Sequence, residues 1–221
     1  MRPICLTALT VLLTAGLSHA ASDLVGHWTF EGCDGKGVKD RSALGNDGTL
    51  AWGEIRQEKG TQSLELDGLD GHVRVDLKTP PDLRTAITVA LWVKASRIRN
   101  HTVLFGIPNP RPDWTTPAFG MYLSGNRVVY GQHGDGKTPK VLLESKAELP
   151  KDQWTFLAAT SDGAALRLYV NGALDAELAK RAVVALNGHP LLIGKGLGDK
   201  PSLKGRIGEL KIFSRALSGD E

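Results

Sequence analysis

One loop of the chain combines the residue types that recognise a sugar. The segment 108–117 contains four prolines, which excludes a central strand, and it carries Arg111, Asp113 and Trp114. A flat aromatic face packs against the C–H groups of a sugar ring, while a few fixed polar groups bind its hydroxyls. We expect further ligand contacts from the strands that follow, at Tyr122, Tyr130 and Gln132. The alternative is that Trp114 only caps the edge of the core.

The other reactive side chains form no recognisable catalytic or transition-metal pattern. The histidines of the expected domain lack the pairwise spacing of a zinc site: His27, His72, His101, His133 and His189. The glycine-rich stretch 194–198 lies between expected strands, so it predicts a turn and not a phosphate site. Cys33 has no partner histidine in a nucleophile signature and is expected to be a partly buried apolar residue.

The first twenty residues have the pattern of a secretory signal peptide. A basic Arg2 precedes an apolar run that is too short to span a bilayer, and small residues precede an expected cleavage after Ala20. The alternative is a membrane anchor. Residues 21–221 are expected to form one domain that is secreted, periplasmic or on the cell surface. With Cys5 removed by cleavage, Cys33 has no partner for an intramolecular disulfide.

Composition and hydrophobic periodicity predict an all-β domain. The chain is 41% hydrophobic and 23% charged with a net charge of +3, ordinary values that give no support for a nucleic-acid partner. Residues 153–178 alternate as three strands, with a hairpin at Asn171-Gly172. About a dozen such short strands predict an antiparallel two-sheet sandwich. We expect residues 52–61 to form a surface loop, and three tryptophans to lie in the core: Trp28, Trp92 and Trp154.

Six segments, in this order, give the chain a resemblance to a known family. They are residues 27–32, 45–50, 63–73, 87–94, 154–172 and 205–221, including HWTFEG, GNDGTL, SLELDG, ITVALWVK, LYVNG and GRIGELKIF. This series is similar to the laminin G-like jelly-roll domains of the concanavalin A-like lectin/glucanase superfamily. The resemblance implies two curved antiparallel sheets whose concave face binds carbohydrate or protein.

The same resemblance implies a structural calcium ion that ties the first strand to the last. The matching oxygen ligands are Glu31, Asp70 and Glu209, a ligand type that suits Ca²⁺. One expected carboxylate is missing, because Gly208 stands where many relatives carry aspartate. The alternative is that these acids are solvated or pair with lysine and arginine.

Enzymes of the superfamily give the alternative function. The nearest match to a laminarinase-type Glu-x-Asp-x-x-Glu motif is Glu65, Asp67 and Asp70, but its third acid is aspartate and it runs into a glycine-rich turn. Gln132-His133 resembles a Gln-x-His pair of alginate lyases, with the wrong spacing. The sequence therefore favours an exported, non-catalytic module that binds carbohydrate or an extracellular protein. A glycan-degrading enzyme and a purely structural module remain alternatives.

Overall fold

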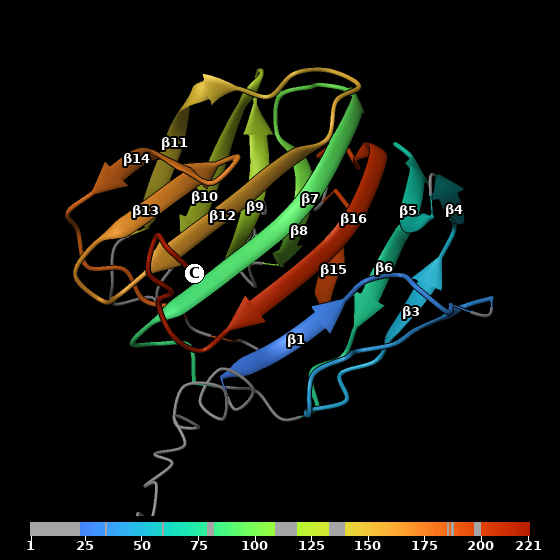
Figure 1. Ribbon diagram of the computed structural model, residues 1–221, viewed down its shortest axis with the longest axis horizontal. Coiled ribbons are helices and arrows are strands. Elements are labelled where there is room, and N and C mark those ends of the chain that lie inside the picture. The colour runs from blue at the N-terminus through green and yellow to red at the C-terminus, as the bar shows by residue number, and fades with distance from the viewer. Residues whose placement is uncertain are drawn as a thin grey trace, which may run out of the picture.

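The protein is built from two antiparallel sheets and no helix among the residues that the computed structural model describes. These residues are 23–33, 35–58, 60–78, 82–108, 119–132, 140–184, 186, 188–196 and 200–221. The expected signal peptide, residues 1–20, lies outside them. Within the described part of the chain, no helix is long and apolar enough to cross a membrane. The expected all-β sandwich is confirmed (Figure 1).

The first sheet has the longest strands of the fold at its centre. Its strand order is β14 (Ala173–Leu178), β13 (Leu166–Val170), β12 (Thr155–Ser161), β7 (Ile87–Arg97), β16 (Lys204–Phe213), β5 (Thr61–Asp67) and β4 (Glu54–Glu58). A further strand, β1 (Leu24–Trp28), also pairs with β16. The expected loop at 52–61 was therefore wrong in part, because β4 pairs along its length with β5.

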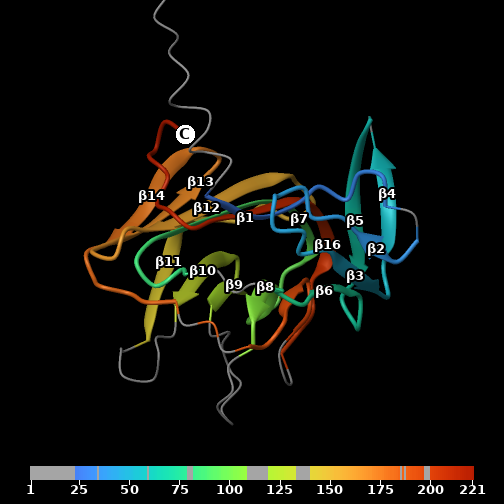
Figure 2. The same ribbon diagram turned by 90° about the horizontal axis from the view of Figure 1, so that it is seen from below.

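The second sheet packs behind the first. Its strand order is β11 (Val141–Glu148), β10 (Arg127–Gln132), β9 (Phe119–Ser124), β8 (Thr102–Ile107), β15 (Leu191–Ile193), β6 (His72–Val75), β3 (Gly48–Ala51) and β2 (Gly37–Val38). Figure 2 shows the sheets as separate layers, with the end of the chain on the outer side of the first sheet. The chain that follows β16 therefore covers part of the outer face of the first sheet, and the rest of that face is exposed.

Alternation along the central strands separates the core from the outer face. On β7, Val89, Leu91 and Val93 are buried between the sheets, whereas Trp92 points outward and is 41% exposed. The hairpin after β13 uses Asn171 and Gly172 at φ values of 51° and 83°, as the sequence predicts for a type I′ turn. The expected core position of Trp28 is confirmed, because its side chain is fully buried.

Asp175 joins the edges of the two sheets. Its carboxylate accepts backbone hydrogen bonds from Lys146 and Ala147 of β11, at 2.6 and 3.0 Å, although Asp175 itself belongs to β14. Charge-assisted bonds of this kind stabilise more than neutral ones. We predict that Asp175→Ala lowers the free energy of unfolding by about 1–3 kcal/mol in a urea titration. Glu177→Ala is the matched control on the same strand; an equal effect of both changes would contradict the proposed role of Asp175.

Candidate functional site

The outer face of the first sheet carries a pocket of about 550 Å³. We call it the tryptophan pocket. Its apolar surface comes from Trp92 and Trp154, which both lie close to Gly208. The remaining lining residues are polar or acidic side chains: Thr29, Glu31, Glu58, Thr61, Ser63 and Glu209. The pocket thus combines flat aromatic surface with hydrogen-bonding oxygens.

Local backbone structure explains why both tryptophans face this pocket. Trp92 occupies an outward position of β7, while Trp154 directly precedes β12 and is 36% exposed. The register of β16 against β7 shifts between Ile207 and Glu209, which leaves Gly208 as an extra residue beneath the rings. A Cβ atom on Gly208 would lie 3.4 Å from the Trp154 ring, so glycine leaves the rings room to approach the strand. The expectation that Trp92 and Trp154 belong to the core was wrong.

Trp92 is held in place from the side. Its ring contacts that of Phe156, with centroids 5.3 Å apart and an interplanar angle of 47°. Phe156 lies directly opposite Trp92 in the β7–β12 register, so the contact is a cross-strand aromatic pair. The pair fixes the orientation of one aromatic face before any ligand arrives.

The acidic side chains of the pocket are held by basic partners. Glu209 Oε1 lies 2.7 Å from His27 Nε2 and 2.9 Å from Lys211 Nζ. Glu58 pairs with Arg206 at 2.7 Å, and Glu31 lies 3.7 Å from Arg41. Ion pairing orients these carboxylates and leaves their other lone pairs available as hydrogen-bond acceptors.

Glu209 remains ionised near neutral pH. Partial burial of its carboxyl favours the protonated form, but hydrogen bonds from Lys211 and His27, together with their charges, outweigh burial and lower the net pKa. A general acid for glycoside hydrolysis requires the opposite shift. Glu209 is therefore suited to accept hydrogen bonds and not to protonate a leaving group.

The residues that the sequence predicted as a binding site lie only partly within the described part of the chain. Arg111, Asp113 and Trp114, as well as His133, lie outside the described residues. Tyr130 and Gln132 are buried in the second sheet, where the Gln132 amide donates a 2.6 Å hydrogen bond to the Tyr130 hydroxyl. Tyr122 is 5% exposed and stacks on His101. None of these described residues lines the tryptophan pocket.

The three expected calcium ligands also do not come together. Glu31 and Glu209 line the tryptophan pocket, whereas Asp70 pairs with Lys195 at 2.5 Å in another part of the fold. No group of three acidic, histidine or cysteine side chains suited to a metal occurs within the described ranges. Asp70 therefore does not share a site with Glu31 and Glu209 in the described part of the chain, and calcium binding remains a prediction of the family resemblance.

The acidic motif near residue 65 has a structural role. Asp67 accepts a 2.8 Å hydrogen bond from the backbone N–H of Leu69 and so forms the turn after β5, as the sequence predicts. Glu65 pairs with Arg56 at 2.8 Å. This motif is therefore not the source of the carboxylates in the pocket.

Solved structures with the same fold include a domain of an extracellular arabinanase and the binding domains of botulinum neurotoxins. Domain 4 of AbnA, a GH43 extracellular arabinanase from Geobacillus stearothermophilus solved with arabinotriose, is 22% identical, with 90% of this chain and 95% of that chain covered and a TM-score of 0.63. The binding domain of botulinum neurotoxin DC, solved with SialylT, is 12% identical, with 90% and 50% covered and a TM-score of 0.69. At these identities the likeness shows the fold.

Sequence comparison gives the family. The pentraxin-related protein PTX3 of Mus musculus is 28% identical over 149 residues, which cover 62% of this chain and 37% of PTX3, so the match spans well under half of that relative. The family model Laminin_G_3, described as the concanavalin A-like lectin/glucanases superfamily, matches residues 67–221. The chain therefore belongs to this laminin G-like family of the concanavalin A-like superfamily.

Proposed function

We propose that this protein is an exported binding module whose tryptophan pocket binds carbohydrate. The observation that carries the proposal is the exposure of Trp92 and Trp154 beside hydroxyl and carboxylate oxygens. Exposed aromatic faces in a hollow bind the apolar faces of sugars, and the surrounding oxygens accept bonds from sugar hydroxyls. The arabinotriose bound by the arabinanase domain supports a sugar ligand.

The charges at the pocket favour a neutral sugar. All three ionisable side chains that line it are glutamates: Glu31, Glu58 and Glu209. A carboxylate accepts hydrogen bonds from the hydroxyl groups of a neutral sugar. The basic partners of these glutamates are not among the residues that line the pocket, so no lining side chain offers a positive charge to a uronic or sialic acid. The test is retention of the purified protein on matched polysaccharides, with arabinan, xylan and β-glucan against pectate and alginate. Retention by neutral polymers supports the proposal, and absence of retention by every polymer in the panel refutes it.

A glycan-degrading enzyme is the second candidate, because three glutamates line one pocket. Retaining glycosidases place two carboxyl groups about 5–5.5 Å apart, one of them with a raised pKa. The lowered pKa of Glu209 does not suit a general acid, so in an enzyme that role would fall to Glu31 or Glu58. Release of new reducing ends from the retained polysaccharide decides between the candidates. Release that disappears in Glu209→Gln or Glu58→Gln would replace the binding proposal with an enzymatic one.

Export rests on the expected signal peptide. The extracellular arabinanase that shares the fold is consistent with a location outside the cytoplasm. N-terminal sequencing of the protein recovered from its native host tests cleavage after Ala20. A mature protein that begins at Met1 would contradict export by this route.

We also propose, from the family resemblance alone, that the fold binds a structural calcium ion. If the fold holds a structural calcium ion, EDTA lowers the melting temperature and added CaCl₂ restores it, because a ligand that binds only the folded state stabilises it. MgCl₂ is the control for ionic strength and for nonspecific divalent effects. An unchanged melting temperature in EDTA would remove calcium from the account.

A further inference from the structure

A second hollow continues the tryptophan pocket along the outer face of the first sheet. Its volume is about 200 Å³, and we call it the far subsite. Glu209 lines both hollows, and Phe156 of the far subsite contacts Trp92 of the tryptophan pocket. Because they share a wall residue and an aromatic contact, the two hollows are neighbouring parts of one surface.

Small residues open the floor of the far subsite. Ala90 and Ala158 lie opposite each other in the β7–β12 register, two residues along from Trp92 and Phe156. Larger side chains surround this low point: Phe156, Tyr169, Lys211 and Phe213. The far subsite therefore repeats the composition of the tryptophan pocket, with aromatic rings beside polar groups.

The C-terminal segment, residues 214–221, closes the far subsite. Leu217, Ser218, Gly219 and Glu221 line it, and a Cβ atom on Gly219 would lie 3.8 Å from the Tyr169 ring. In Figures 1 and 2 the chain turns back after β16 and ends on the outer side of the first sheet, beside β12 and β13. Trp92, Ala90 and Thr88 follow one another on the outer face of β7, and about 13 Å separates Trp92 from Thr88. The C-terminal segment covers the Thr88 end of this row.

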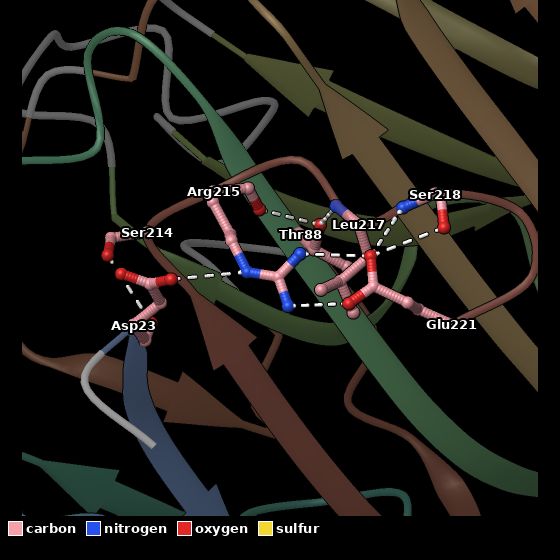
Figure 3. Close-up of polar contacts among 7 residues, drawn as sticks. All are labelled: Asp23, Thr88, Ser214, Arg215, Leu217, Ser218 and Glu221. Carbon is pink, nitrogen blue, oxygen red and sulfur yellow. Dashed lines mark hydrogen bonds and ion pairs between the residues drawn. The ribbon is translucent and has the colours of Figure 1, made fainter. Parts of the chain in front are cut away.

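Arg215 and Thr88 fasten this segment to the sheet. Figure 3 shows the Arg215 guanidinium between Asp23 and Glu221, at 3.2 Å from Asp23 and at 2.6 and 3.0 Å from the two Glu221 oxygens. The buried Thr88 hydroxyl donates to the Arg215 carbonyl and accepts from the Leu217 N–H, both at 2.8 Å. Hydrogen bonding to Arg215, with a second bond from Ser218, lowers the pKa of Glu221 to about 2. The carboxylate is therefore ionised under ordinary assay conditions.

We infer that the tryptophan pocket and the far subsite form one groove for an oligosaccharide, and that the C-terminal segment is the end wall that limits the length of chain bound. This inference rests on the proposed carbohydrate function. It assigns Ala158 to the floor of the far subsite and Arg215 to positioning of the wall. Affinity should rise with the number of sugar units until the chain reaches the wall, and then level off.

The experiment measures dissociation constants by calorimetry for a ladder of oligosaccharides, from two to eight units, of the polymer that the full chain retains. Wild type is expected to gain at least about tenfold in affinity along the ladder, equivalent to 1.4 kcal/mol, before it levels off. Ala158→Leu fills the floor and is expected to reduce that gain to less than about threefold. Leu69→Ala, in an exposed turn outside the groove, is the control and should keep the wild-type gain.

Arg215→Ala tests the wall separately. Loss of both ion pairs should loosen residues 217–221, so the levelling-off point moves to longer chains. Near-ultraviolet circular dichroism establishes that each variant keeps its tertiary packing.

If wild type binds no member of the ladder, the proposed function fails. If it binds with a length dependence that neither Ala158→Leu nor Arg215→Ala changes, the groove and its end wall are refuted while the tryptophan pocket stands.

Discussion

Replacing Trp154 with alanine is expected to weaken glycan binding by about ten- to a hundredfold, or 1.4–2.8 kcal/mol. The Trp154 ring supplies much of the apolar surface of the tryptophan pocket. The polar side chains that line the rest of the pocket cannot replace an aromatic face on which a sugar ring stacks. Trp154 is chosen over Trp92 because Trp92 also packs on Phe156 and so has a larger structural role. Because Trp154 is partly exposed, its removal should cost at most about 2 kcal/mol of folding stability.

Trp52→Ala is the matched control for this experiment. Trp52 is 76% exposed and does not line the pocket, so its loss should leave the dissociation constant within about twofold of wild type. Calorimetric titration with the retained oligosaccharide measures all three proteins. Wild-type affinity in Trp154→Ala would show that the sugar binds elsewhere.

Trp114→Ala tests the site that the sequence predicted. If the proline-rich segment carries the ligand, this variant loses affinity while Trp154→Ala does not. If the tryptophan pocket carries it, the order reverses. A loss of affinity in both variants would indicate that one ligand contacts both the proline-rich segment and the tryptophan pocket. The two alanine variants therefore distinguish the sequence prediction from the structural one with the same assay.

The sequence was sufficient for the fold because its main signals are local. Alternation along β7 and the Asn171-Gly172 pair depend on neighbouring residues, and both predicted the observed strand and turn. β4 was harder to predict, because all but one of its residues are exposed and its pairing with β5 provides the evidence for a strand. A polar edge strand lacks the hydrophobic period on which such predictions depend.

The binding site could be predicted only in part, since it depends on which face of a strand each residue occupies. Leu91 and Val93 point into the core, so alternation already required Trp92 to face outward. The large apolar side chain of Trp92 suggested a core position, but the alternation of buried and exposed residues along β7 predicted its orientation correctly. The meeting of Trp92, Trp154 and Glu209 arises from the pairing of β7 with β12 and β16, which no short motif in the sequence encodes.

Asn46→Ala should lower the free energy of unfolding by about 2–4 kcal/mol, more than either Asp175→Ala or Trp154→Ala. The Asn46 side chain is fully buried: its amide donates to the Val25 carbonyl at 3.2 Å, and its carbonyl accepts from the Lys78 N–H at 3.1 Å. Alanine removes both bonds and leaves the Lys78 N–H without this acceptor. For a domain of this size the loss corresponds to a fall of roughly 5–15 °C in melting temperature.

The neighbouring contacts explain why this loss should spread beyond one side chain. The Asn46 backbone N–H donates to Asp40 at 2.7 Å, and its carbonyl accepts from the indole N–H of the buried Trp28 at 3.0 Å. The same Asp40 carboxylate accepts from the His27 N–H, so Asn46 connects the loop before β3 to β1. Asn126→Ala, in the exposed turn between β9 and β10, is the control and should change stability by less than about 0.5 kcal/mol. Equal urea midpoints for Asn46→Ala and Asn126→Ala would show that the strands hold β1 in place without this buried amide.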